Sequence, residues 1–406
     1  MNKSARFKRP SLVTTAIAVG TLCVGAWHAE ADTFVQTNLV SDIKGLAELT
    51  EPELVNPWGI SHTDTSPIWT SNQGTNTANL FAVTPTLMKV TAVSPTTDGN
   101  IAIPTTGMGQ PPQGPTGQVA NPTTSFPVSV MSGGDGGSAH FIFANLNGTI
   151  SAWDTGPKAF IQQTISGASY TGLAIVNLPQ PQGPLLYAAN NAAGRIDVFN
   201  GSFTQVNNGA FATPMAIQQA GLVPFNVQTL SNGNVAVTYA PPKRTDQQNA
   251  ARGTGAVAIF DATGTTLLQT ILGDSNHPLA APWGITLAPA GFGSFGGDLL
   301  VGNFSYIASE INIFNPLTGA FLGTTIPINV GSNLSGGLWA LVFGTGGSNG
   351  SPNTLFFTDG INREMDGLFG EINVNVPGPI AGAGLPGLIF AGGGLLGWWR
   401  RRQKIA

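Results

Sequence analysis

The chain has 406 residues, of which 42% are hydrophobic, 9% are charged and 54 are glycine. Low charge with this hydrophobic content excludes a disordered chain, and frequent glycine between short apolar runs indicates an all-β protein. The span 32–376 holds 8 Lys and Arg against 19 Asp and Glu, a formal charge of −11. We therefore expect no binding to nucleic acid, whose phosphates this surface repels.

Residues 1–31 have the pattern of a secretory signal peptide. Four basic residues precede an uncharged apolar run at 12–27, and small residues stand at positions −3 and −1 of 29–31. The pattern predicts export by the Sec route and cleavage by signal peptidase before Asp32. Cys23, the only cysteine, lies in the removed segment, which excludes thiol chemistry in the mature chain. An uncleaved N-terminal anchor is the alternative.

From residue 57 onward, three short apolar strands separated by Gly-rich turns occur six times. The first strands are predicted at 57–60, 126–131, 170–176, 224–230, 283–287 and 337–343. The second strands are predicted at 68–72, 141–145, 185–190, 234–239, 298–302 and 354–359, and the third strands at 78–83, 148–154, 194–199, 255–260, 310–314 and 367–374. Fourth strands follow at 88–93, 160–165, 267–272 and 321–326. Six such units predict an all-β, six-bladed β-propeller with four-stranded blades over residues 32–376.

The sixth unit has no fourth strand of its own. Residues 34–40 (FVQTNLV) resemble the fourth strands and precede the first unit, so we expect them to complete the sixth blade and close the ring. Closure removes an exposed sheet edge. The long segments 96–125 and 240–254 are predicted to be loops, of a length that is usually functional or mobile.

Residues 377–406 combine a proline motif, an uncharged run at 380–399 and a terminal arginine cluster. The run is about long enough to span a bilayer as a helix. Together these features resemble a PEP-CTERM sorting tail of Gram-negative bacteria, which implies transient anchoring in the inner membrane and recognition by an exosortase. The usual Pro-Glu-Pro is Pro377-Gly378-Pro379 here, a departure that bears on cleavage by that enzyme. A plain C-terminal transmembrane anchor is the alternative.

One polar position repeats at the end of the second strands. It is occupied by Asn72, Asn145, Asn190, Tyr239, Asn303 and Asp359. We expect these side chains to form a ring on one face of the propeller, near the channel. They are interpreted either as turn-capping residues or as ligands for a polar molecule or a Ca²⁺ ion, with Asn190, Asn303 and Asp359 as the candidate metal ligands.

The same face is expected to carry Arg244, Arg252 and Arg363, as part of a site for a carboxylate or a sulfated sugar or as ordinary solvated loop residues. Tryptophans recur on the first strands, at Trp58, Trp283 and Trp339. We expect them to pack in the core, and sugar-stacking platforms are the alternative.

Several motifs carry a family resemblance: Asn56-Pro57-Trp58-Gly59-Ile60, Gly194-Arg195-Ile196-Asp197-Val198-Phe199, Ala281-Pro282-Trp283-Gly284, Leu299-Leu300-Val301-Gly302-Asn303-Phe304 and Gly337-Leu338-Trp339-Ala340-Leu341. On these residues the chain resembles a family of uncharacterised exported bacterial propeller proteins, some of which carry PEP-CTERM tails. The resemblance covers about residues 34–375. It implies a six-bladed propeller outside the cytoplasm, at the cell surface or in the extracellular space, and no particular activity.

No hydrolase, zincin, P-loop or EF-hand motif is present. We therefore expect a non-enzymatic binding or scaffold protein of the cell envelope or extracellular matrix, whose loops contact polysaccharide or protein. The alternative is a Ca²⁺-dependent hydrolase that uses the propeller channel, by analogy with lactonase-type six-bladed propellers.

Overall fold

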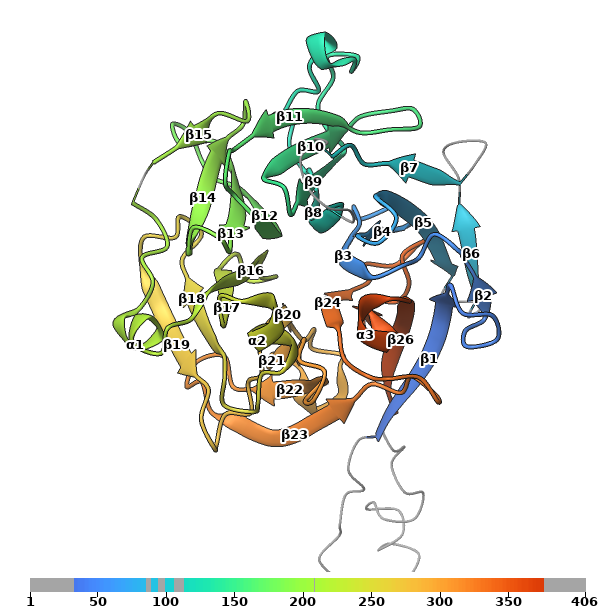
Figure 1. The fold of residues 1–406 in the computed structure, drawn as a ribbon, viewed down its shortest axis with the longest axis vertical. Helices are drawn as coiled ribbons and strands as arrows, with labels where there is room; N and C mark the ends of the chain where they lie inside the picture. Colours follow the sequence, from blue (N-terminus) through green and yellow to red (C-terminus); the bar gives the residue numbers. More distant parts are fainter. Residues whose placement is uncertain (1–32, 85–88, 94–98, 106–112, 208, 376–406) are drawn as a thin grey trace, which may run out of the picture. The chain divides into compact units, whose positions relative to one another are not determined.

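Six sheets whose main strands run antiparallel surround a central axis in the computed structural model, which describes residues 33–375 apart from 85–88, 94–98, 106–112 and 208 (Figure 1). Four strands form the body of each sheet. The sheets of the first and the last blade each contain one additional short strand. The described residues all belong to one compact unit, Asp32–Val376. The chain is therefore an all-β, six-bladed propeller with four-stranded blades, as the repeat predicts.

The blades contain the following strands. Blade 1 contains β3 (Pro57–Ser61), β4 (Ile68–Asn72), β5 (Thr77–Thr84) and β6 (Lys89–Val93), with β7 (Asn100–Ala102) paired to β5; blade 2 contains β8 (Pro115–Ala120), β9 (Phe141–Asn145), β10 (Thr149–Trp153) and β11 (Phe160–Thr164). Blade 3 contains β12 (Tyr170–Asn177), β13 (Pro184–Asn190), β14 (Arg195–Asn200) and β15 (Gln205–Val206); blade 4 contains β16 (Val223–Thr229), β17 (Val235–Ala240), β18 (Ala256–Phe260) and β19 (Leu267–Leu272). Blade 5 contains β20 (Pro282–Leu287), β21 (Leu299–Asn303), β22 (Glu310–Phe314) and β23 (Phe321–Pro327); blade 6 contains β24 (Leu338–Phe343), β25 (Leu355–Asp359), β26 (Leu368–Asn375) and β1 (Thr33–Ser41), with β2 (Leu49–Thr50) beside β1.

Short helical segments lie in the connections between strands. They are α1 (Met215–Gln219), α2 (Arg244–Gln248), α3 (Ile361–Glu364) and the 3-10 turns η1 (Val130–Ser132) and η2 (Gly293–Phe295). In Figure 1, α2 and α3 lie near the axis, whereas α1 lies at the rim beside β19.

Glycines on the innermost strands allow neighbouring blades to touch through their backbones. A Cβ atom at Gly59 would lie 2.6 Å from the carbonyl oxygen of Thr116 in the next blade, and one at Gly284 would lie 2.2 Å from the carbonyl oxygen of Trp339. Glycine alone lacks the side-chain carbon that such an approach forbids. The repeated glycine of the first strands therefore sets the tight spacing around the axis.

The two ends of the propeller sequence close the ring together. β1 pairs antiparallel with β26 from Thr33 opposite Asn375 to Ser41 opposite Leu368, so blade 6 takes its outer strand from the start of the domain. This confirms the predicted closure. A second contact between blades 6 and 1 comes from the loop after β24, where the Ser348 carbonyl accepts a 2.8 Å hydrogen bond from the backbone N–H of Val83.

Three tryptophans fill the axis. The rings of Trp58 and Trp339 stack with their centroids 3.6 Å apart, and Trp283 meets Trp339 edge-on at 5.6 Å. All three are buried, in one cluster with Phe225 and Phe304. The prediction that these tryptophans pack in the core is confirmed, and the core that they form lies in the channel itself.

The prediction for the inner strand of blade 2 is wrong. We expected it at 126–131, but the structure places it at β8 (Pro115–Ala120), within the segment predicted to be a loop. The apolar residues Phe126 and Val128 are fully buried, but in a connection that packs against blade 2 from outside the sheet. The sequence Pro115-Thr116-Gly117 repeats the Pro-x-Gly start of β3 and β20. This motif indicates the inner strand, whereas the apolar residues of 126–131 point to the wrong segment.

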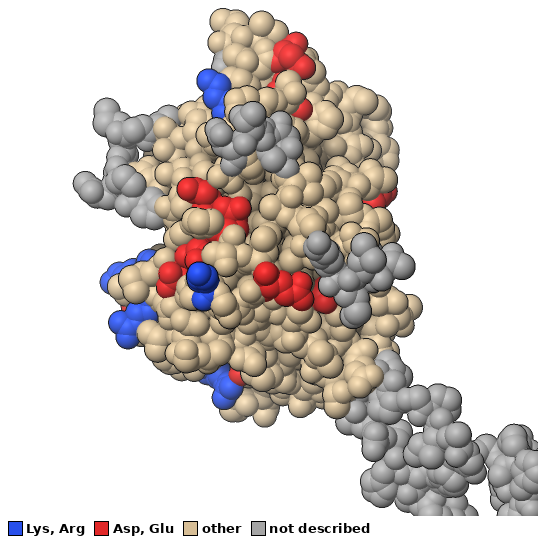
Figure 2. Space-filling model, turned by 90° about the vertical axis from the view of Figure 1, so that its right-hand side faces the viewer, with Lys and Arg blue, Asp and Glu red and all other residues tan. Residues whose placement is uncertain are grey.

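The predicted signal peptide (1–31) and C-terminal sorting tail (377–406) lie outside the described residues. Within the described ranges, no helix is long and apolar enough to cross a membrane. Figure 2 shows one side of the ring, most of which carries no charge; acidic atoms gather in patches near its middle, where a basic group lies beside them.

Candidate functional site

Two loop segments lie over one mouth of the channel. α2 belongs to the connection between β17 and β18 in blade 4, and α3 to the connection between β25 and β26 in blade 6 (Figure 1). Both connections join the second and third strands of their blades, so they emerge on the same face of the ring. We call this face the α2–α3 face.

Arg244 of α2 links these two segments above the tryptophans. Its guanidinium pairs with the carboxylate of Glu364 and lies 4.2 Å from the ring centroid of Phe304 and 4.9 Å from that of Trp339. A cation over aromatic faces is attracted by their negative electrostatic potential, more strongly when water is excluded. Arg244 therefore fastens α2 to the aromatic core and to α3, and covers the channel on this face.

Glu364 is the centre of a hydrogen-bond network. Besides Arg244, it accepts hydrogen bonds from Asn56 Nδ2 at 3.2 Å, Tyr306 Oη at 2.6 Å and Gln248 Nε2 at 3.1 Å. Four donors thus converge on a carboxylate whose side chain is only 13% exposed. Burial and the nearby Glu364 charge raise the pKa of Tyr306 above its usual range, so the phenol stays a hydrogen-bond donor.

The backbone beneath this network is in an uncommon conformation. Asn362, Arg363 and Glu364 have φ angles of 54°, 59° and 67°, a left-handed turn made without glycine. Such conformations cost of order 1–3 kcal/mol each and persist where surrounding contacts impose them. Asn362 supplies such contacts: its Oδ1 accepts the Leu334 N–H at 2.9 Å, and its Nδ2 donates to Asp366 Oδ2 at 2.8 Å.

A groove of about 380 Å³ runs beside the covered mouth. Its walls come from α2, from the loop after β21, from the connection before β24 and from α3. Its lining consists of the polar residues Gln248, Asn249, Tyr306 and Ser335, the apolar residues Ile307 and Leu334, and Arg363. Because Gln248 and Tyr306 are held by Glu364, part of the polar lining is fixed before any ligand arrives.

Of the three arginines predicted for this face, two are engaged by carboxylates. Arg244 pairs with Glu364, and Arg252 Nε donates to Glu310 Oε1 at 2.7 Å. Arg363 is exposed and lines the groove, and it has no carboxylate partner in the described part of the chain. The sequence places Glu364 in the loop of blade 6 on this face, but it does not single out Gln248 or Tyr306. It also does not predict the contact of Glu364 with α2, because the turn that makes this contact has no sequence signature.

The polar residues at the ends of the second strands are buried within their own blades and adjoining connections. Asn72 donates to Thr77 at 3.1 Å, and Asn145 donates to the Pro104 carbonyl at 3.0 Å. Asn190 Oδ1 accepts the backbone N–H groups of Ser169 and Ala193 at 3.2 and 3.1 Å, while Asn303 Oδ1 accepts the Ala280 N–H at 2.9 Å. These bonds are the turn and loop capping expected of asparagine.

These residues do not fit a Ca²⁺ ion, which takes six to eight oxygen ligands. The side-chain oxygens of Asn190 and Asn303 already accept backbone hydrogen bonds, as described above. No group of three or more His, Cys, Asp or Glu side chains within residues 33–375, as far as they are described, is placed to hold a metal. In the described part of the chain, the oxygens of the candidate ligands Asn190 and Asn303 are thus used by backbone hydrogen bonds.

Tyr239 and Asp359 occupy the same strand position and are fully buried. Burial raises the pKa of Tyr239. The carboxyl oxygens of Asp359 have no hydrogen-bond partner in the described part of the chain, and burial raises the pKa of Asp359 to about 8. Asp359 is therefore held as a neutral acid at pH 7.

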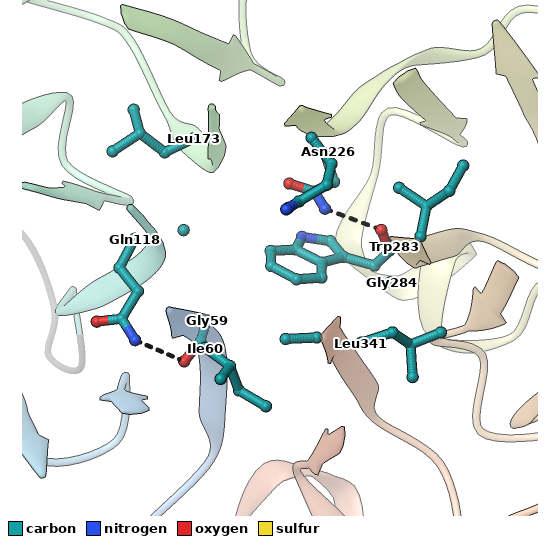
Figure 3. A pocket seen from close by; sticks show the side chains of 12 residues that line it. Gly59, Ile60, Gln118, Leu173, Asn226, Trp283, Gly284 and Leu341 are labelled. Carbon is teal, nitrogen blue, oxygen red and sulfur yellow. Dashed lines mark hydrogen bonds between the residues drawn. The ribbon is translucent and has the colours of Figure 1, made fainter. Parts of the chain in front are cut away.

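Below the tryptophans the axis is nearly closed. A cavity of about 10 Å³, room for about one water molecule, lies among the inner strands near Gln118, Asn226 and Trp283 (Figure 3). Asn226 Nδ2 donates to the Trp283 carbonyl at 2.9 Å, and Gln118 Nε2 donates to the Gly59 carbonyl at 3.2 Å. A pocket of about 200 Å³, bordered by Ser61 and His62 among others, lies where the inner strands end. It adjoins the small cavity, since Ile60, Gln118 and Gln228 line both.

No family model matches the chain. A relative is an uncharacterised protein of Acanthamoeba polyphaga mimivirus, 26% identical over 347 residues that cover 82% of this chain and 78% of the viral protein. Among solved structures, virginiamycin B lyase from Staphylococcus aureus aligns with a TM-score of 0.48 and 14% identity, over 84% of this chain and 99% of the lyase. A gluconolactonase from Xanthomonas campestris aligns with a TM-score of 0.34 and 18% identity, over 58% and 82% of the two chains. The fold assignment rests on this chain's own strand order, which is that of a six-bladed β-propeller.

Proposed function

We propose that the protein is an exported binding protein of the cell surface or extracellular matrix, and that the α2–α3 face binds extracellular polysaccharide. The observation that carries this proposal is the groove beside Glu364. Amide, hydroxyl and guanidinium groups line it together with exposed aliphatic side chains, and Glu364 already orients Gln248 and Tyr306. Sites for small polar ligands combine such fixed polar groups with apolar walls.

The covered channel supports binding at the surface rather than a reaction within the ring. Arg244 and the tryptophans fill the mouth on the α2–α3 face, and the cavity beneath them has room for about one water molecule. A rigid propeller that presents connecting loops on one face is a common arrangement for recognition. Export is supported by the sequence patterns at 1–31 and 377–406.

A groove-filling substitution tests the binding proposal. Ser335→Trp places an indole at the groove lining, and Ser332→Trp adds the same ring to an exposed position of the same connection that is not part of the lining. With protein purified from the full-length chain, we expect Ser335→Trp to weaken polysaccharide binding by about tenfold or more and Ser332→Trp to leave it unchanged. Equal binding by both variants, or no polysaccharide bound by the wild type, would contradict the proposal.

Export has its own test. Mass spectrometry of the protein recovered from the cell surface or medium should find an N-terminus at Asp32. Protein that keeps Met1 and stays in the cytoplasmic fraction would refute export and with it the extracellular ligand.

A further inference from the structure

We propose that the groove recognises the carboxylate of a uronic acid residue, that Arg363 pairs with it, and that the ligand is therefore an acidic rather than a neutral polysaccharide. This inference rests on the proposed function and names the ligand class of the same groove.

Arg363 differs in its contacts from the other arginines that the structure describes. Arg195 pairs with Asp197, Arg244 with Glu364 and Arg252 with Glu310, so each has a carboxylate of this chain. The side chain of Arg363 is exposed at the groove, and within the described ranges it forms no ion pair. Its guanidinium is thus available to form two parallel hydrogen bonds with one carboxylate.

The backbone at Arg363 is held in place before binding. Its φ angle of 59° lies in the middle of the left-handed turn, which Asn362 and Glu364 fasten to the Leu334 connection and to α2. Fixing the backbone in advance lowers the entropy that binding must remove. The left-handed turn therefore holds the backbone of Arg363 in a fixed position at the groove.

The charge around Arg363 favours a single carboxylate over a densely sulfated chain. The span 32–376 has a formal charge of −11, and the groove lining has one basic residue and no acidic one. Glu364, which lies beside it in the sequence, is already compensated by Arg244. One guanidinium matches one carboxylate, whereas closely spaced sulfates would meet the acidic remainder of the surface.

The neighbours of Arg363 match the rest of a sugar ring. Gln248 donates through Nε2 to Tyr306 and Glu364, and Asn249 donates through Nδ2 to the Thr245 carbonyl, which leaves their Oε1 and Oδ1 oxygens to accept from sugar hydroxyls. Ile307 and Leu334 are 65% and 56% exposed, so both offer apolar surface to the C–H face of a pyranose. A peptide bound by strand addition would call for an open strand edge, and none of the lining residues belongs to a strand.

The test compares a tetrasaccharide that carries a single glucuronic acid residue with the same tetrasaccharide after its one carboxyl group is reduced to a primary alcohol. Binding is measured by calorimetry on protein purified from the full-length chain. We expect the wild type to bind the acid form about 10- to 100-fold more tightly than the reduced form, since hydrogen bonds to charged groups contribute about 1.5–3 kcal/mol. Arg363→Gln should remove that preference, and Arg195→Gln, at an exposed arginine of blade 3, should preserve it.

The outcomes separate the two proposals. If the wild type binds neutral polysaccharide at the groove but shows no preference for the acid tetrasaccharide, the carboxylate inference is overturned and the proposed function stands. If Arg363→Gln retains the preference, the inference is overturned as well, provided that its unchanged melting temperature shows a folded variant. Binding of a peptide carboxylate in place of every sugar would overturn both.

Discussion

The indole nitrogen of Trp283 in blade 5 donates a 2.8 Å hydrogen bond to the backbone carbonyl of Thr171 in blade 3. These blades are not neighbours in the ring, so the bond reaches past blade 4 close to the axis. Thr171 is buried, and its carbonyl would be left without this donor if the indole were replaced. The tryptophans of the channel therefore fix the relative positions of blades as well as filling space.

Trp283→Phe should lower the free energy of unfolding by about 1–3 kcal/mol more than Trp58→Phe, because only the former leaves a buried carbonyl without its donor. The control is matched: Trp58 is equally buried, and its Nε1 has no hydrogen-bond partner in the described part of the chain. Urea denaturation of the two variants measures the difference. Equal losses would mean that the bond across the axis contributes nothing.

Leu39→Ala in β1 should cost about 2–5 kcal/mol of unfolding free energy, as expected for a large buried aliphatic side chain. Leu39 is 2% exposed in the closing strand, whereas Val35 of the same strand is 51% exposed. Val35→Ala should cost no more than about 0.5 kcal/mol. If β1 were a loosely attached edge, the two variants would show similar denaturation midpoints.

Arg244→Lys should destabilise the fold by about 1–2 kcal/mol although it keeps the charge, because the lysine loses the planar contact with Phe304 and Trp339. Arg252→Lys is the control, since Arg252 is 61% exposed and pairs with Glu310 alone. Lysine keeps the charge beside Glu310 and the arginine side is largely exposed, so the effect should be small, about 0–1 kcal/mol. The reverse order of the two melting temperatures would show that Arg244 does not fasten α2 to the core.

Asp359→Asn should change how stability depends on pH. The carboxyl has an ordinary pKa of 3.8 when unfolded, and burial raises it to about 8 in the folded protein. Between these values the folded state keeps a proton that the unfolded state releases, so the contribution of Asp359 is complete below about pH 4 and is lost as the pH rises toward 8, by up to ~1.4 kcal/mol per pH unit.

Asparagine carries no such proton, and it occupies the corresponding position in blades 1, 2, 3 and 5. The variant should therefore gain stability relative to the wild type when denaturation is measured at pH 8 instead of pH 5. Parallel pH profiles for the two proteins would refute a buried neutral acid at this position.

Much of the fold follows from local patterns. Short apolar strands and Gly-rich turns are visible in the sequence, and the likeness of 34–40 to the outer strands is enough to predict the closure that β1 and β26 make. The inner strand of blade 2 was missed because Pro115–Ala120 is small and polar, and it is buried by neighbouring blades rather than by its own hydrophobicity. The burial of this strand depends on its position in the ring, and a short stretch of sequence does not contain that information.

The candidate site was harder to predict for the same reason. Counting basic residues brought Arg244, Arg252 and Arg363 together, but only the folded loops show that two of them have carboxylate partners. Glu364 accepts hydrogen bonds from Asn56, Gln248 and Tyr306, which belong to three other blades. These contacts depend on a left-handed turn that the local sequence, which has no glycine there, does not predict. Such convergence depends on the ring being closed.

Hydrogen exchange of the protein with and without a bound acidic polysaccharide tests the central claim, that the α2–α3 face is the binding face. We expect slower exchange in the segments around the groove, at 245–249, 305–308, 333–336 and 361–366, and unchanged exchange at the pocket on the inner-strand ends, at 60–62, 118–120 and 228–229. Protection confined to the inner-strand ends, with none around Arg363, would contradict the account.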